Sequence, residues 1–247
     1  MIDVDTDRDL CVVLARGGSK GVHKKNLRCI DGRPLVSYAL NSAAEVAQQR
    51  SLDLVLSSDD SEILALAEQH HFVPLQRPKH LAQDLTPSFP AVMHAMEEME
   101  SRRKAKYRNI LYLQSTAPLC KVSDIVAAFQ CLEERGDFQS VVAVVEAETH
   151  PFRLKRLLAD GTLLNFIEQG FEDMRPRQQL PPVFRRAGSI YLSRRQVLVD
   201  HHSLVGSPCF GMEVSRESAI DIDSEIDFEL ASVLIKKVKG NNREAEN

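Results

Sequence analysis

The 247-residue sequence lacks the marks of several protein classes. Its five cysteines include no C-x-x-C pair and have no histidines at zinc spacing, so neither a disulfide framework nor a zinc site is indicated. No apolar stretch approaches the roughly 20 residues that span a bilayer, and the start MIDVDTDRDL is acidic, unlike a signal peptide. We therefore expect reduced thiols and a cytoplasmic protein with no membrane partner.

A strong net charge is also missing. The formal net charge is −4 and there is no long basic run, so we expect no nucleic-acid partner. The hydrophobic content of 43% is enough for a sizeable core, as one large domain or one domain with a small appendage. Positive charge that is concentrated locally is then expected to serve a local purpose.

Such a concentration occurs in residues 10–26, LCVVLARGGSKGVHKKN. The apolar run at its start is typical of a strand covered on both faces. The glycines that follow let backbone N–H groups approach an anion, and the arginine and lysines add positive charge. The spacing fits neither the P-loop nor the Rossmann fingerprint. The stretch predicts a polyphosphate-binding loop, and the alternative is an ordinary solvated basic turn.

The rest of the chain alternates between strand-like and helix-like patterns. Strands are predicted at residues 10–14, 52–57, 109–113 and 140–145, and helices at about 34–50, 60–71, 87–106 and 122–135. Alternation of this kind predicts an α/β fold with a parallel sheet. Because ligands bind at the carboxyl ends of such strands, three turns are expected to meet at one edge: residues 16–26, 57–59 and 114–118.

Residues 146–190 interrupt this rhythm and are richer in Arg, Gln and Pro. We predict an inserted arm there, with a catalytic domain made of residues 1–145 plus 191–247. The arginines of the arm have few acidic partners nearby in sequence and suit a carboxylate or phosphate. The alternative is a basic flap without a ligand. A projecting arm also indicates a partner subunit against which it packs.

A second concentrated signal is the sequence AIDIDSEID, in which Asp221 and Asp223 alternate with isoleucines. In an extended strand the two carboxylates point to one face, where they repel one another. A divalent cation relieves this conflict, and Mg²⁺ prefers one or two carboxylates together with substrate phosphates. The alternative is that Asp223 or Ser224 caps a helix that begins near Glu225.

Several motifs in order give the chain a resemblance to the acylneuraminate cytidylyltransferases, or CMP-sialic acid synthetases, of the short bacterial kind. It extends from about residue 10 to 237 and rests on LARGGSKG, LSSDD, QRPKHLAQDLTPS, LQSTAPL, RPRQQLPPVFR with GSIY, and AIDIDSEID. The resemblance implies a three-layer, glycosyltransferase-A-like nucleotidyltransferase fold with a mostly parallel sheet. It also implies CTP as donor, a nonulosonic acid as acceptor, Mg²⁺ as cofactor and a homodimer whose arm completes the partner's active site.

The resemblance assigns roles to individual positions. It places Arg16, Ser19, Lys20 and Lys25 at the triphosphate, Asn26, Arg77, Ser88 and Gln114 at the nucleotide, and Asp221 and Asp223 at the metal. On the sugar side it places Gln114, Lys155, Arg177, Arg185 and Tyr191, with Arg153 as the other possible register for Lys155. Arg16, Lys20, Lys25 and Asp223 are the expected catalytic residues, with Asp223 taking the hydroxyl proton.

Two positions depart from the family pattern. His23 replaces a common loop proline, and Ala187 stands where the family has an asparagine near the sugar. The second departure leaves the identity of the acid open among sialic, legionaminic and pseudaminic acids, with the shorter octulosonic acid ranked lower. Another sugar nucleotidyltransferase, or a binding protein without catalysis on the same fold, is the remaining alternative.

Overall fold

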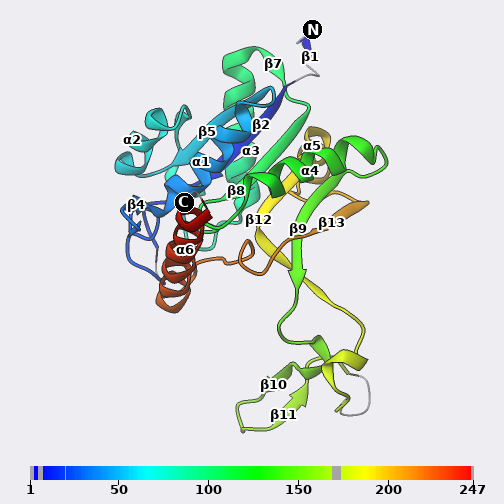
Figure 1. Cartoon of the computed structure of the whole chain (residues 1–247). Coiled ribbons are helices and arrows are strands. Elements are labelled where there is room, and N and C mark those ends of the chain that lie inside the picture. Colours follow the sequence, from blue (N-terminus) through cyan, green and yellow to red (C-terminus); the bar gives the residue numbers. More distant parts are fainter. Residues whose placement is uncertain (1–2, 5–7, 20, 169–173, 246–247) are drawn as a thin grey trace.

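The computed structural model describes residues 3–4, 8–19, 21–168 and 174–245. In this part of the chain a central sheet of seven strands has the order β13-β9-β12-β8-β2-β5-β6 (Figure 1). Its strands are β2 (Asp9–Leu14), β5 (Leu52–Ser58), β6 (Val73–Gln76), β8 (Asn109–Gln114), β9 (Ser140–Glu146), β12 (Phe184–Arg194) and β13 (Cys209–Glu213). All neighbouring pairs are parallel except those that β12 makes with β8 and β9. The expected mostly parallel sheet is confirmed.

Helices cover both faces of the sheet, which gives three layers. Alternate residues of β2 show this division: Cys11 and Val13 belong to one buried cluster, and Leu10 and Val12 to the other. The first cluster is completed by α1 (Leu35–Ala47), α2 (Ser61–Gln69) and α4 (Val122–Glu134), and the second by α3 (Ser88–Arg103) and α5 (Arg195–His201). The strand β2 is fully buried because it lies in the middle of this sandwich.

The sequence predicted the first four long strands and the four helices between them, each to within a few residues of its observed ends. The Asp60 carboxylate caps α2 by accepting the N–H groups of Glu62 and Ile63, as its place before an apolar helix indicates. The strand β12, which pairs antiparallel with β8 and β9, was not among the predicted strands, because its first residues fall in the segment expected to form the arm.

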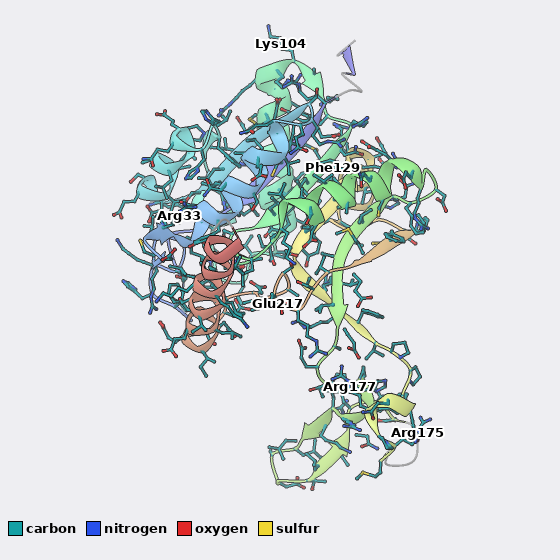
Figure 2. All side chains as sticks on the ribbon, in the orientation of Figure 1. Arg33, Lys104, Phe129, Arg175, Arg177 and Glu217 are labelled. Atoms are coloured by element: carbon teal, nitrogen blue, oxygen red, sulfur yellow. The ribbon has the colours of Figure 1, made fainter. Side chains whose placement is uncertain are left out.

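Between β9 and β12 the chain leaves the sheet and forms an arm that projects from the body of the molecule (Figure 1). The arm contains an antiparallel hairpin of β10 (Lys155–Leu157) and β11 (Leu163–Asn165), flanked by the short helices η2 (Pro151–Arg153) and η3 (Arg177–Gln179). Figure 2 labels Arg175 and Arg177 in this region. Several large apolar side chains of the arm are exposed, so it has little core of its own.

The remaining described elements are short, apart from one long helix. They are β1 (Asp3–Val4) paired with β7 (Ala105–Lys106), the hairpin of β3 (Cys29–Ile30) and β4 (Arg33–Pro34), the helix η1 (Lys79–Leu81) and the long α6 (Glu225–Ala245). Phe228, Ala231 and Ile235 of α6 pack against Val22 and Ile30 of the loop after β2. Among the described helices, none has the length and apolar character to span a membrane.

Candidate active site

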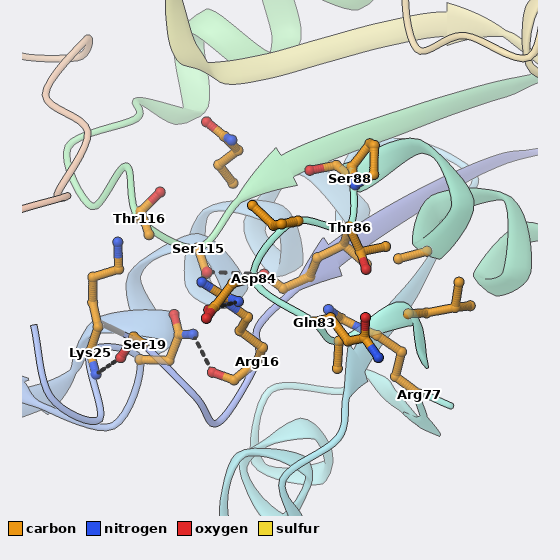
Figure 3. Close-up of a pocket in the computed structure, with 18 of the residues that line it drawn as sticks. Arg16, Ser19, Lys25, Arg77, Gln83, Asp84, Thr86, Ser88, Ser115 and Thr116 are labelled. Carbon is orange, nitrogen blue, oxygen red and sulfur yellow. Dashed lines mark hydrogen bonds and ion pairs between the residues drawn. The ribbon is translucent and has the colours of Figure 1, made fainter. Parts of the chain in front are cut away.

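The expected convergence of loops at one edge of the sheet is present. A cavity of about 590 Å³ opens at the carboxyl ends of β2, β6 and β8 (Figure 3). The Ser115 hydroxyl joins two of these loops by donating to the Leu14 carbonyl at 3.0 Å, and Gly17 N–H joins a third by donating to Asp59 Oδ1 at 3.0 Å. Nine of the expected site residues line the cavity: Arg16, Ser19, Lys25, Asn26, Arg77, Ser88, Gln114, Asp221 and Asp223.

The loop after β2 is held in shape by its own polar groups. The Ser19 hydroxyl donates to the Val22 carbonyl at 2.6 Å and accepts the Lys25 N–H at 3.0 Å. A Cβ on Gly21 would collide with the backbone oxygen of Asp223, so only glycine allows the loop to touch the aspartate segment. Lys20, expected at the triphosphate, lies outside the described residues.

Two cations of this loop face the cavity, each beside a carboxylate. Arg16 Nη1 lies 2.6 Å from Asp84 Oδ1. Lys25 Nζ donates to the Ile222 carbonyl and lies 3.2 Å from Asp223 Oδ1. The loop therefore brings two cations to the cavity, which a polyphosphate could contact in place of these carboxylates.

The residues expected at the nucleoside are polar, and two of them, Asn26 and Arg77, are buried. Asn26 donates to the Arg16 carbonyl at 2.9 Å, but its buried Oδ1 has no partner among the described residues. Burial lowers the pKa of Arg77, whose guanidinium donates to the hydroxyl and carbonyl of Ser57. Ser88, at the start of α3, accepts a hydrogen bond from the Tyr112 hydroxyl at 3.2 Å. Together these groups offer a hydrogen-bonding surface to a base or a ribose.

Asp221 and Asp223 approach the cavity from the segment before α6, and this segment is not the strand expected from the sequence. The segment is not a strand because its backbone bonds to loops and not to a neighbouring strand. The Ile222 N–H donates to the Thr116 carbonyl at 2.9 Å and the Ile222 carbonyl accepts from Lys25, so single bonds to two loops replace a strand ladder. Ile222 is buried between two aspartates that line the same cavity, so the predicted alternation of faces is present without the strand.

The alternative of helix capping is satisfied by Ser224, not Asp223. The Ser224 hydroxyl accepts the Asp227 N–H at 3.4 Å, and Asp227 Oδ2 accepts the Ser224 N–H at 2.8 Å, which forms a reciprocal cap at the start of α6. The side chain of Asp223 is 80% exposed. Its carboxylate is therefore available to the cavity.

Asp221 is the buried member of the pair. Burial, followed by the charge of Asp223, raises the pKa of the Asp221 carboxyl, and its Oδ1 is buried without a partner in the described structure. Gln114 Oε1 is unpartnered in the same way. Gly188, with φ +76°, lies between the two, and a Cβ there would fall 2.7 Å from Asp221 Oδ2 and 2.9 Å from Gln114 Oε1. Two unpaired acceptors beside a carboxylate pair are suited to a cation.

The residues expected on the sugar side lie farther apart from one another than those expected at the nucleotide. Arg185 lines a second cavity of about 630 Å³ that also contains Asp221 and Asp223, and it binds both oxygens of Glu148 at 3.0 Å. That contact lowers the pKa of Glu148 to about 2. Tyr191 stacks on Tyr112, with ring centres 5.7 Å apart.

The other two sugar-side residues lie on or beside the arm. Arg177 binds Glu146 at 2.9 Å, and Lys155 Nζ donates to Asn165 Oδ1 at 2.6 Å across the hairpin. Neither lines the two cavities that hold the aspartates. Few acidic residues lie near the arm arginines in sequence, but the fold brings Glu146 to Arg177 and Glu148 to Arg185. Ala187 is buried in the core of the sheet.

Sequence reasoning missed Asp84 and Thr116, which also line the main cavity. Both lie inside motifs noted above, QRPKHLAQDLTPS and LQSTAPL. Acidic side chains are not expected in a phosphate site, so Asp84 gave no signal of its own. The site as a whole can hold a polyphosphate against Arg16 and Lys25, with the carboxylate pair beside Lys25.

Comparisons with known proteins agree with this chemistry. A family model described as Cytidylyltransferase matches residues 10–233. The chain is 30% identical to the CMP-N,N'-diacetyllegionaminic acid synthase of Campylobacter jejuni, over 92% of this chain and 94% of the relative. It is 28% identical to the pseudaminic acid cytidylyltransferase of Campylobacter jejuni, over 93% and 97%.

A further relative and a solved structure differ in how they match. The N-acylneuraminate cytidylyltransferase of Escherichia coli is 25% identical over 92% of this chain, which covers 52% of that relative. The solved structure of CMP:2-keto-3-deoxy-manno-octonic acid synthetase complexed with CTP has a TM-score of 0.68 at 15% identity, over 93% of this chain and 99% of that chain. At that identity the likeness shows a common fold.

Proposed function

The chain belongs to the cytidylyltransferase family, as its motifs predict, and we propose that it transfers CMP from CTP to the anomeric hydroxyl of a nonulosonic acid and releases pyrophosphate. The observation that carries the proposal is the cavity of about 590 Å³, whose lining brings Arg16 and Lys25 together with Asp221 and Asp223. The cytoplasmic location stays a prediction.

The acid is a sialic acid or one of its relatives. The chain matches the Campylobacter jejuni enzymes named for legionaminic and pseudaminic acid over nearly their whole length, but spans about half of the Escherichia coli relative named for N-acylneuraminate. This difference favours legionaminic or pseudaminic acid as the preferred substrate.

In the proposed reaction the hydroxyl oxygen of the sugar attacks the α-phosphate of CTP, and the bond to pyrophosphate breaks. Catalysis of this type depends mainly on positioning and on neutralising charge. Arg16 and Lys25, with Lys20, would hold the phosphates that leave, while Asn26, Arg77 and Ser88 would hold the nucleoside. The buried Asn26 Oδ1, which has no partner among the described residues, supports this division.

The residues present fit a divalent cation. Asp221 has a buried oxygen without a partner, and its pKa is raised by burial and by Asp223, so a cation there would compensate both costs. Bound Mg²⁺ would neutralise phosphate charge. Asp223 is the expected proton acceptor, because its carboxylate is exposed to the cavity whereas that of Asp221 is mostly buried.

Pyrophosphate release tests this function. The assay combines CTP and Mg²⁺ with N-acetylneuraminic, legionaminic, pseudaminic and octulosonic acids in turn, and repeats the preferred acid with ATP, GTP and UTP. We expect turnover with CTP and a nine-carbon acid. Tight binding of CTP without turnover on any acid would instead support a binding protein, and turnover with another nucleotide would indicate a different sugar nucleotidyltransferase.

We also propose that the chain acts as a homodimer joined through the arm. Leu157, Leu163 and Phe166 of the arm are 72%, 61% and 58% exposed, which is costly for apolar side chains in water. Lys155 lies among them on the hairpin, away from the two cavities of its own subunit that hold the aspartates. A second subunit would cover the apolar side chains and receive Lys155 at its own active site.

Light scattering together with subunit mixing tests the dimer. Leu157→Glu with Leu163→Glu should give a folded monomer of low activity. A mixed dimer of Lys155→Ala and Asp223→Asn subunits contains one intact site. An equal mixture should therefore recover about a quarter of wild-type activity if the subunits associate at random, and about a half if every dimer is mixed. A dimer with no recovery would place Lys155 outside the partner's site, and an active monomer would exclude the dimer proposal.

A further inference from the structure

Asp84 places a negative charge inside the cavity proposed for the triphosphate. Its Oδ1 lies 2.6 Å from Arg16 Nη1, and the two side chains are 34% and 32% exposed. Figure 3 shows the pair in the middle of the cavity, on the same side as Lys25. The Arg16 guanidinium, which faces the cavity from the loop after β2, is therefore already paired with the Asp84 carboxylate.

Lys25, the second cation of the loop, is paired with a carboxylate of a different kind. Its partner Asp223 lies next to Asp221, so Asp223 has a role beside a bound cation once nucleotide is present. Asp84 is not among the groups whose charges shift the pKa of Asp221, which are Asp223, Lys25 and Asp227.

The segment that carries Asp84 is built largely on itself. Leu81 N–H donates to the Pro78 carbonyl at 2.9 Å, Ala82 N–H to Lys79 at 3.1 Å, and the Thr86 hydroxyl to His80 at 3.1 Å. These bonds stay intact if residues 78–87 shift as a unit. Such a shift would break the ion pair between Asp84 and Arg16.

We propose that Asp84 competes with the triphosphate for Arg16 and thereby sets the affinity of the site for nucleotide and for pyrophosphate. The proposal rests on the proposed function in so far as the ligand is CTP. In the empty site Asp84 holds the guanidinium in position. A bound phosphate takes its place, because two anions at one guanidinium repel. After transfer, Asp84 returns to Arg16 and promotes release of pyrophosphate. The residue thus lowers the affinity for nucleotide and speeds the release of product.

Binding of inorganic tripolyphosphate, CTP and cytidine to Asp84→Asn, measured by calorimetry, tests this inference. An exposed ion pair changes an equilibrium constant by up to about fivefold, and the removed repulsion adds to this. We expect Kd for tripolyphosphate and CTP to fall about three- to tenfold and Kd for cytidine to stay unchanged. The gain should shrink in 0.5 M salt, because salt screens the competing charge.

Glu62→Gln is the matched control. Glu62 lies 3.5 Å from Lys24 of the same loop, but neither residue lines the cavity. An equal gain in Glu62→Gln would reduce the effect to net charge and overturn the proposal, as would weaker tripolyphosphate binding by Asp84→Asn. Because tripolyphosphate carries no base, tighter binding of it in a protein that never turns over CTP would leave the role of Asp84 standing and reject the enzymatic function.

Discussion

The two ends of the central sheet treat buried carboxylates in opposite ways. At the amino end of β2, Asp9 is fully buried and accepts hydrogen bonds from Arg50, Arg108 and Asn109 at 2.9 to 3.2 Å. At the carboxyl end, Asp221 has an unpartnered oxygen and a neighbour of like charge. A carboxylate whose hydrogen bonds are complete serves the fold, and one left incomplete is reserved for a ligand.

The largest effect on stability is expected from Asp9→Ala. The change leaves the Asn109 amide and two arginines without their buried acceptor, although Glu133 still pairs with both arginines. We expect a loss of about 3 kcal/mol in the free energy of unfolding, at the lower end for a broken buried pair. Urea denaturation measures it. Unchanged CTP affinity in the folded protein would show that the two ends are independent, and a large affinity loss would contradict the comparison.

Asp221→Asn should have the opposite effect to Asp9→Ala, because it should lower activity and leave stability unchanged. Loss of one charge from the proposed cation site should lower kcat/KM about 10²- to 10³-fold, the scale for removing one electrostatic contact to a transition state. Stability without added metal should not fall, because the substitution removes a half-buried charge that Asp223 repels. Parallel measurements of pyrophosphate release and thermal unfolding in EDTA decide the matter, and a destabilised variant with near-normal turnover would assign Asp221 to the fold.

Glu100 is another buried carboxylate whose hydrogen bonds are complete, and its contribution to stability should depend on pH. Burial alone raises the pKa of this carboxyl, but hydrogen bonds from Arg195, Lys106 and the Tyr107 N–H outweigh burial and lower it below its usual 4.5. A lowered folded pKa means stability that is present above pH 4.5 and lost as pH falls through the folded pKa. Glu100→Gln should therefore cost about 1.5 to 3 kcal/mol at pH 7.

The measurement for Glu100 is the difference in unfolding free energy between wild type and Glu100→Gln from pH 7 down to the acid limit of folding. This difference should narrow as the pH drops below 4.5. A constant difference across the range would mean that packing, not charge, makes Glu100 important.

The smallest effect is expected from Gly188→Ala. The positive φ costs an L-residue about 1 kcal/mol, and the new Cβ would push Gln114 and Asp221 apart. We expect a comparable loss of stability and about a tenfold fall in kcat/KM. Activity and melting temperature measured on one preparation test this, and an active Gly188→Ala would show that the two acceptors need not be close together.

Much of this architecture is local information and could be predicted from sequence. Apolar runs and a cap such as Asp60 identified four strands and the helices between them, and parallel pairing then placed three loops at one edge. The antiparallel β12 and the ion pairs of Arg177 and Arg185 could not be predicted, because long-range pairing determines them. Nor could Asp84, whose charge opposes the expected ligand. The roles of the site residues stay predictions.

The contact between Lys25 and Asp223 joins positions 198 residues apart. During synthesis, the phosphate loop therefore leaves the ribosome long before the aspartates that face it exist. A nascent chain cannot assemble the site until the residues through Asp227, which hold the start of α6, have been made. Nucleotide binding is thus a late event in the life of the chain, and acquired activity reports that almost the whole sequence has folded.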